Sequence, residues 1–87
     1  MREKWTKLKE AAVNIDSEGI NQWMKDFTVI TDKLLPHILQ EVSYKERREI
    51  MEQLKDIFEA CQMKDSIMLK DAFIYGLANS IEKYFDQ

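Results

Sequence analysis

The single histidine and the single cysteine are the two side chains of this sequence best suited to catalysis or metal binding. His37 precedes Glu41 by four residues, so on a helix the two share one side. Such a pair can act as a general base with its carboxylate partner, or as two ligands of a metal ion. Nothing else in the pattern completes a site around them, and a di-iron bundle would need Glu-x-x-His pairs on two helices. We therefore expect His37 to be a boundary or surface residue, with no metal site.

Cys61 could act as a nucleophile if its thiol were ionised. It has no Cys-x-x-Cys or His-x-x-Cys companion, and it continues an apolar stripe. This pattern favours a small buried side chain, with a reactive thiol as the alternative. The sequence also contains no glycine-rich phosphate loop. We therefore expect a protein that is not an enzyme and that binds no cofactor.

Composition predicts one all-α domain across residues 1–87. Apolar residues make up 45% and charged residues 33% of the chain, as in a globular protein. Only two glycines and one proline occur, whereas a β-rich chain of this length would need more of both for its turns. Glu, Lys, Leu, Met, Ile and Ala, which favour helix, are abundant.

Charge and hydropathy restrict the partners and the location. The net charge of −3 argues against nucleic-acid binding, which needs a basic surface to neutralise phosphates. No apolar run approaches the roughly 18–20 residues that cross a bilayer, and lysines interrupt the start where a signal peptide would be apolar. A lone cysteine cannot form an internal disulfide. These features predict a cytoplasmic protein.

Apolar residues at helical spacing predict four helices, over residues 2–14, 17–42, 43–61 and 66–85. Short connections between the last three make these helices antiparallel neighbours. The predicted fold is a small up-down antiparallel bundle of three main helices plus a short N-terminal helix. Pro36 lies inside the longest segment, and because the apolar stripe resumes in phase after it, we expect a kink there rather than a break.

Capping residues mark the expected helix starts. Asp16 or Ser17 can cap the second helix, and Asp65 or Ser66 the fourth. Ser43 and Glu46 have the spacing of a capping box, in which the Glu46 carboxylate reaches back to the Ser43 amide. Gly76, within the fourth helix, suggests a close approach by a neighbouring helix.

The fourth helix has an apolar surface about twice as wide as contact with one neighbour requires. One seam contains Leu69, Phe73, Leu77 and Tyr84, and a second contains Ile67, Ile74, Ala78, Ile81 and Phe85. The other helices could cover both seams. Alternatively, the second seam, with Trp5 or Trp23 nearby, forms a groove for a protein partner or for self-association as a homodimer. The predicted partner-binding residues are Ile67, Ile74, Ala78, Ile81, Phe85 and Trp5.

The basic start of the chain supports a second functional hypothesis. The segment KWTKLK could lie on an anionic membrane with Trp5 and Leu8 inserted, although its short stripe and modest charge favour packing on the bundle. A membrane role would make the chain a bacteriocin-immunity-like protein acting at the membrane face. The leading hypothesis is a small regulator, adaptor or chaperone that binds a protein.

The stretch YKERREIMEQLKDIFEACQMKDSIMLKDAFIYGLANSIEKYF resembles the C-terminal half of small, uncharacterised helical proteins of Firmicutes. In that family a Lys-Asp loop precedes a helix with the pattern seen here at Leu69, Asp71, Tyr75 and Leu77, after a long helix with a proline such as Pro36. The resemblance covers about residues 17–85 and departs at Gly76, where those proteins often have acidic residues. It implies a Gram-positive bacterial cytoplasmic protein and no particular activity.

Overall fold

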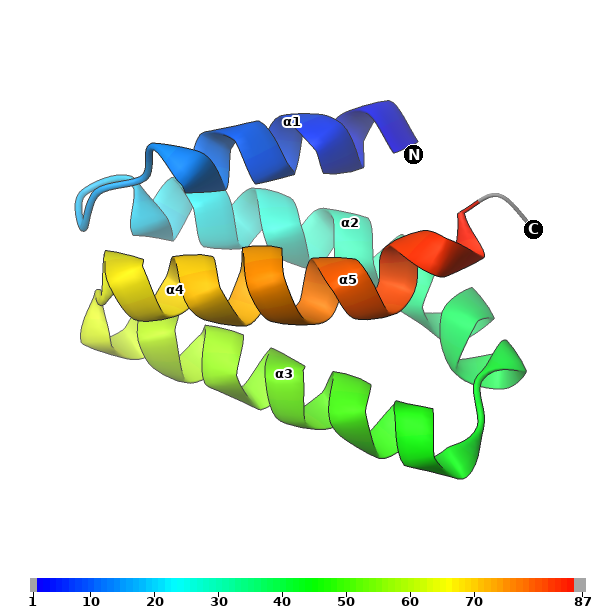
Figure 1. The fold of residues 1–87 in the computed structure, drawn as a ribbon. Coiled ribbons are helices and arrows are strands. Elements are labelled where there is room, and N and C mark those ends of the chain that lie inside the picture. The colour runs from blue at the N-terminus through cyan, green and yellow to red at the C-terminus, as the bar shows by residue number, and fades with distance from the viewer. Residues whose placement is uncertain (1, 86–87) are drawn as a thin grey trace.

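The computed structural model describes residues 2–85, and every regular element in that range is a helix (Figure 1). The all-α prediction is therefore confirmed. The elements are α1 (Arg2–Val13), α2 (Ile20–Glu41), α3 (Tyr44–Met63), α4 (Ser66–Ala72), the π-helical η1 (Phe73–Leu77), α5 (Ala78–Ile81) and the 3₁₀ helix η2 (Glu82–Tyr84). The last four follow one another without a break, and we call Ser66–Tyr84 the C-terminal segment.

Figure 1 shows α1, α2, α3 and the C-terminal segment side by side, with the chain reversing direction at each connection. Apolar side chains from all of them meet in one buried cluster. Phe73 lies at its centre, with its ring centroid 5.1 Å from that of Trp5, 4.9 Å from that of Trp23 and 5.7 Å from that of Phe27. Trp5 comes from α1, and Trp23 and Phe27 come from α2, so both helices cover the C-terminal segment, which also packs against α3.

Two indole groups attach α1 to the rest of the molecule. Trp23 Nε1 donates a hydrogen bond of 3.1 Å to the carbonyl of Leu8, and Trp5 Nε1 donates one of 3.1 Å to Glu82 Oε2. Both indoles are almost fully buried, so each polar N–H has the partner that a buried donor needs. The N-terminal helix thus packs against α2 and the C-terminal segment.

The helix starts follow the predicted capping residues in two cases out of three. Ser43 Oγ accepts a hydrogen bond from the Glu46 amide at 3.2 Å, and Asp65 Oδ1 accepts one from the Met68 amide at 3.0 Å. The prediction for α2 is wrong, because this helix begins at Ile20 with Gly19 as its N-cap and no side-chain cap. Asp16 Oδ1 instead accepts from the Gly19 amide at 2.9 Å and closes the preceding turn.

Two further expectations concern backbone geometry inside helices. The helix α2 continues through Pro36 to Glu41, and Figure 1 shows its last turns bent away from the axis of the first ones, so the chain does not break there. The close approach predicted at Gly76 is wrong. A Cβ atom at this position would meet its nearest neighbour, Gln53 Cγ, at 3.6 Å, which is an ordinary van der Waals distance.

Candidate functional site

The residues with catalytic potential lie apart from one another. His37 and Glu41 are both exposed near the end of α2, and Cys61 is half-buried on α3. Burial raises the pKa of the Cys61 thiol, which disfavours the thiolate needed for nucleophilic chemistry. Within residues 2–85, no three histidine, cysteine, aspartate or glutamate side chains are grouped so as to hold a metal ion.

The six predicted partner-binding residues do not form one surface. Trp5, Ala78 and Ile81 are at most 1% exposed and belong to the core. Ile74 and Phe85 are half-buried, whereas Ile67 is 72% exposed. The chain itself therefore buries two of the five residues of the second seam, Ala78 and Ile81, whereas its two ends and Ile74 reach the surface.

The predicted seams assume an ideal α-helix, whereas the C-terminal segment contains a π-helical turn that changes which side chains share a face. On an α-helix, residues four apart drift by about 40° per step, because each residue turns by about 100°. In η1 the Ala78 amide bonds to the Phe73 carbonyl, five residues back, and this wider turn removes part of the drift. As a result Leu69, Phe73, Leu77 and Ile81, each four residues apart, are all fully buried in one row.

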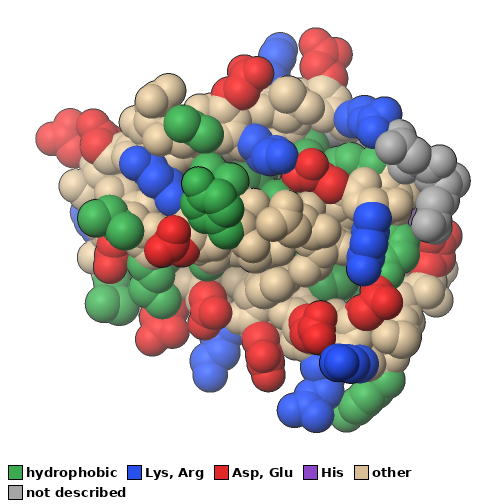
Figure 2. Space-filling model, viewed as in Figure 1, with side chains coloured by type: hydrophobic (Ala, Val, Ile, Leu, Met, Phe, Trp, Pro, Cys, Tyr) green, Lys and Arg blue, Asp and Glu red, His purple; other side chains and the backbone are tan. Residues whose placement is uncertain are grey.

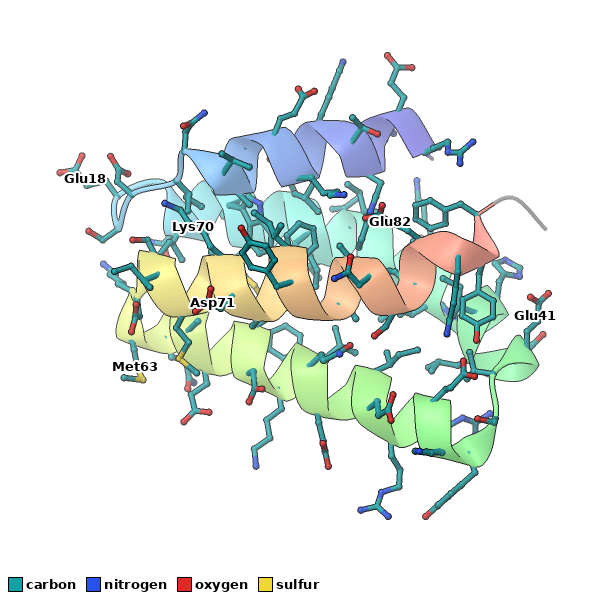
Figure 3. All side chains as sticks on the ribbon, in the orientation of Figure 1. Glu18, Glu41, Met63, Lys70, Asp71 and Glu82 are labelled. Carbon is teal, nitrogen blue, oxygen red and sulfur yellow. The ribbon has the colours of Figure 1, made fainter. Side chains whose placement is uncertain are left out.

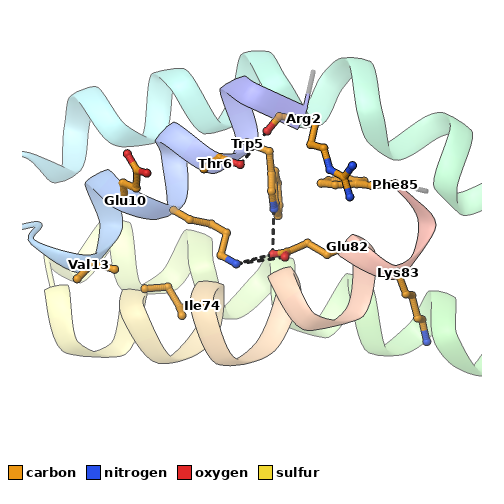
Figure 4. Close-up of a pocket in the computed structure, with 10 residues that line it drawn as sticks. Arg2, Trp5, Thr6, Glu10, Val13, Ile74, Glu82, Lys83 and Phe85 are labelled. Atoms are coloured by element: carbon orange, nitrogen blue, oxygen red, sulfur yellow. Dashed lines mark hydrogen bonds and ion pairs between the residues drawn. The ribbon is translucent and has the colours of Figure 1, made fainter. Parts of the chain in front are cut away.

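The first surface groove lies between α1 and the C-terminal segment, and we call it the α1 groove (Figure 4). It has a volume of about 610 Å³. Its lining consists of Arg2, Trp5, Thr6, Lys9, Glu10, Val13, Ile74, Glu82, Lys83 and Phe85. It thus contains three of the predicted residues, Trp5, Ile74 and Phe85, although the Trp5 side chain is almost completely buried at its base.

One ion pair, between Lys9 and Glu82, lies in the α1 groove. Glu82 Oε2 lies 2.8 Å from Lys9 Nζ and also accepts from the Trp5 indole, as the dashed lines in Figure 4 show. Both ion-pair side chains are 34% exposed, so water reaches the pair and weakens its contribution to stability. The main role of these contacts is to hold α1 against the C-terminal segment.

A second groove lies between α3 and α4, and we call it the acidic groove. It has a volume of about 620 Å³. Its lining consists of Gln53, Asp56, Asp65, Ile67, Met68, Asp71, Ala72 and Gly76. Figure 3 shows Asp71 on the side of α4 nearer α3, while Lys70 projects to the other side. Of the predicted residues only Ile67 lines this groove, so the two ends of the second seam face different grooves.

Sequence reasoning missed the polar residues of the acidic groove. Asp56 and Asp71 are typical of solvated helix faces, and nothing in the spacing of the chain shows that α3 and α4 bring them to one groove. Asp71 does stand four residues after Ile67 and four before Tyr75, which places all three along one side of the segment. This four-residue spacing was the one sequence signal for the surface beside the groove, where Tyr75 is 73% exposed.

Glu46 joins the start of α3 to the end of the chain instead of completing its capping box. Its carboxylate accepts a hydrogen bond from the Tyr84 hydroxyl and lies 3.6 Å from Lys83 Nζ. The hydrogen bond from Tyr84 holds the pKa of Glu46 below its ordinary value and raises the pKa of Tyr84 to about 12. The predicted return of the carboxylate to the Ser43 amide is therefore wrong, since Tyr84 and Lys83 provide the competing partners.

Arg47, which falls within the apolar arc of α3, has a structural partner. Its Nη2 donates a hydrogen bond of 2.6 Å to the Leu39 carbonyl. That carbonyl lies in the last turn of α2, where the backbone oxygens lack partners within their own helix. Arg47 thus caps the C-terminal end of α2 by donating to one of its last carbonyls.

Comparison of the chain with protein-family models, with curated protein sequences and with solved structures finds no match in any of the three. The family resemblance noted from the sequence therefore stays a prediction. Among the described residues, no helix combines the length and the apolar character needed to cross a bilayer.

Proposed function

We propose that this chain is a small up-down antiparallel bundle that acts without enzymatic chemistry, by binding a protein partner through the C-terminal segment. The observation that carries this proposal is the exposure of Ile67 and Tyr75, at 72% and 73%, on the segment that otherwise supplies the buried centre of the core. The cytoplasmic location expected from the sequence is compatible with such a role and stays a prediction.

The exposed row supports binding because it combines apolar and charged groups next to a groove. Ile67, Asp71 and Tyr75 follow one another at steps of four residues, and Ile67 and Asp71 also line the acidic groove. Tyrosine is among the residues enriched at protein interfaces, since its ring provides apolar area and its hydroxyl a hydrogen bond. A partner could therefore bury the row and fill the groove beside it.

The membrane-face alternative would need α1 to leave the core. Trp5 and Leu8, the side chains that would enter lipid, are 1% and 4% exposed. The exposed side of the docked helix presents Lys4 and Lys7 without these two anchors. We therefore place the proposed binding on the C-terminal segment.

A comparative pull-down tests the proposal. The baits are the wild type, the double variant Ile67→Ser with Tyr75→Ser, and a control, Val13→Ser with Val29→Ser. The control removes two valines that are 54% and 56% exposed on α1 and α2, so it deletes exposed apolar groups without changing the C-terminal segment. We expect the same protein to be enriched by the wild type and the control and lost with the first double variant.

Equal recovery by all three folded baits would contradict the proposal. If the partner is a second copy of the chain, light scattering will show a doubled mass for the wild type and the control, and a single mass for Ile67→Ser with Tyr75→Ser.

A further inference from the structure

We infer that a second copy of this chain packs against α3 in antiparallel orientation and covers an exposed apolar row on that helix. The row consists of Tyr44, Met51 and Phe58, and we call it the α3 row. It lies on a different helix from the proposed partner-binding residues, so the inference goes beyond the proposed function. It follows from the exposure of the row, from a hollow beside it, and from the order of the charges that flank it.

The α3 row is apolar and open to solvent. Tyr44, Met51 and Phe58 are 76%, 51% and 45% exposed, and because they follow at steps of seven residues, they lie along one side of the helix. At 1.5 Å per residue, the row extends over about 21 Å. The Phe58 ring also packs against that of Phe27, at a centroid distance of 6.4 Å, so the core fixes its orientation. Aromatic and methionine side chains held at a surface in this way are typical of protein interfaces.

A hollow of about 500 Å³ lies along the same side of the helix. Its lining consists of Met51, Leu54, Lys55, Phe58, Glu59 and Gln62. All six residues belong to α3, so no other helix within residues 2–85 contributes to this lining. The hollow can therefore receive a side chain from outside the molecule.

Four charged side chains flank the α3 row on one side, and their signs alternate. They are Arg48, Glu52, Lys55 and Glu59, all exposed, and within residues 2–85 none of them forms an ion pair. Figure 2 shows acidic and basic side chains interspersed along the lower edge of the molecule, which α3 forms. Two charges of each sign give this flank no preference for a polyanion such as a nucleic acid or an anionic membrane. Read in the opposite direction, however, the order of signs is reversed, so the flank is complementary to itself.

Antiparallel packing about a two-fold axis brings this flank of one copy against the same flank of the other. Arg48 lies four residues from the start of α3 and Glu59 four residues from its end, while Glu52 and Lys55 lie eight residues from the start and the end. With the two helices overlapping along their whole length, Arg48 faces Glu59 of the second copy and Glu52 faces Lys55 of the second copy. The symmetry repeats both pairs. Exposed ion pairs contribute little affinity, but they fix the orientation and the register of the two helices.

The same register fills the hollow. Met51 lies seven residues from the start of α3, so in the second copy it comes level with the position seven residues from the end, which is residue 56. This level falls between Lys55 and Phe58, which line the hollow. A side chain that enters a hole formed by residues of the facing helix is the packing found in coiled coils. The apolar row and the charges thus require one and the same arrangement.

The test measures the molecular mass of the full chain by sedimentation equilibrium over a range of concentrations, and it compares two variants of identical composition and net charge. Arg48→Glu with Glu59→Arg exchanges two charges that face each other, so opposite charges still meet across the axis. Arg48→Glu with Glu52→Arg places like charges opposite each other in all four pairs. This second exchange keeps opposite charges four residues apart within the helix, so it does not weaken α3 itself.

We expect a doubled mass for the wild type and for Arg48→Glu with Glu59→Arg. The dissociation constant of Arg48→Glu with Glu52→Arg should rise by about tenfold or more, because like charges that face each other across an interface oppose association. Circular dichroism verifies that both variants remain helical. A single mass for the wild type at every concentration, or equal dissociation constants for the two exchange variants, would overturn the inference.

The apolar row is tested by Tyr44→Ser with Met51→Ser, which removes exposed side chains without making a cavity in the core. Its dissociation constant should also rise by about tenfold or more, since each copy loses apolar area that the dimer buries. The control, Val13→Ser with Val29→Ser, removes exposed apolar groups from α1 and α2 and should leave the dissociation constant unchanged. Equal weakening by this control and by the α3 variant would contradict the inference.

The variant Ile67→Ser with Tyr75→Ser separates this inference from the proposed function. It should keep the doubled mass, because it leaves α3 unchanged, and it should lose the partner in the pull-down. If it gives a single mass while the α3 variants keep the doubled mass, the copies associate through the C-terminal segment, so the inference is wrong and the proposed function stands. If all baits recover the same proteins while only the α3 variants dissociate, the inference stands and the proposed function fails.

Discussion

Glu46 shows how one side chain can link the start of α3 to the last turn of the C-terminal segment in a way that local sequence does not reveal. Ser43 and Glu46 have capping-box spacing, and half of that prediction is confirmed, since the Ser43 hydroxyl does accept the Glu46 amide. The carboxylate, however, binds Tyr84, which lies 38 positions further along the chain. A four-residue pattern predicts the hydrogen bond between the Glu46 amide and the Ser43 hydroxyl. It cannot predict that the Glu46 carboxylate binds Tyr84 instead of the Ser43 amide, because only folding brings Tyr84 near.

The variant Tyr84→Phe tests this link. Both pKa shifts arise mainly from the same hydrogen bond, so removing the hydroxyl should raise the pKa of Glu46 toward its ordinary value of 4.5. Carbon-detected NMR titration of the Glu46 carboxyl in the two proteins measures the change. An identical titration curve in both would show that the Tyr84 hydroxyl does not bind this carboxylate in solution.

The pH dependence of the free energy of unfolding follows from the lowered pKa of Glu46 and the raised pKa of Tyr84. The lowered pKa of Glu46 stabilises the fold above 4.5, and this contribution is lost as pH falls through the folded-state value. The raised pKa of Tyr84 stabilises the fold below its ordinary 10.0, and this contribution is lost as pH rises toward about 12. The stability difference between wild type and Tyr84→Phe should therefore be largest between pH 4.5 and 10.0 and shrink on both sides.

At the scale of helices, the sequence predicted where the helices lie, but it did not predict which side chains of the last helix share one face. The four predicted helical segments match the observed ones to within about three residues at their ends. The sequence assigned Ile81 to the second seam because it assumed a uniform 3.6-residue turn, whereas η1 is a π-helix and Ile81 is buried in one row with Leu69, Phe73 and Leu77. A π turn has no strong sequence signal here, since FIYGL reads as ordinary helix with one glycine. Packing of Phe73 among three aromatic rings accompanies it.

The connection between α3 and α4 provides a prediction at this scale. Lys64 ends α3 in the left-handed conformation, with φ 54° and ψ 39°, and the Asp65 amide bonds back to the Ala60 carbonyl at 2.9 Å. A residue with a Cβ is disfavoured in this conformation, which suits glycine best. Lys64→Gly should therefore stabilise the protein, by about 0.5–1 kcal/mol.

Urea unfolding followed by circular dichroism measures this effect, with Lys55→Gly as the control. Lys55 lies in the middle of α3, where glycine should instead destabilise by about 1 kcal/mol. Destabilisation by both substitutions would contradict the left-handed end of α3.

At the scale of the whole molecule, the sequence predicted an all-α chain with an excess of apolar surface on its last helix. The sequence could not decide whether the other helices or a partner protein cover that surface. The reason is that α1 is short and its position depends on long-range contacts. The path is set by Trp5, Trp23 and Glu82, whose hydrogen bonds join residues 15 and 77 positions apart. The acidic groove was equally unpredictable, because its aspartates meet only once α3 and α4 pack.

The central structural claim is that the chain itself buries the row Leu69, Phe73, Leu77 and Ile81 of the C-terminal segment and leaves Ile67 outside. The most direct test compares Ile81→Ala with Ile67→Ala, the same substitution at sites that are 0% and 72% exposed on the same segment. Urea unfolding should show a loss of about 2–5 kcal/mol for Ile81→Ala, because a buried cavity results. Ile67→Ala should change stability by no more than about 0.5 kcal/mol. Equal losses for the two variants, or the reverse order, would contradict the account.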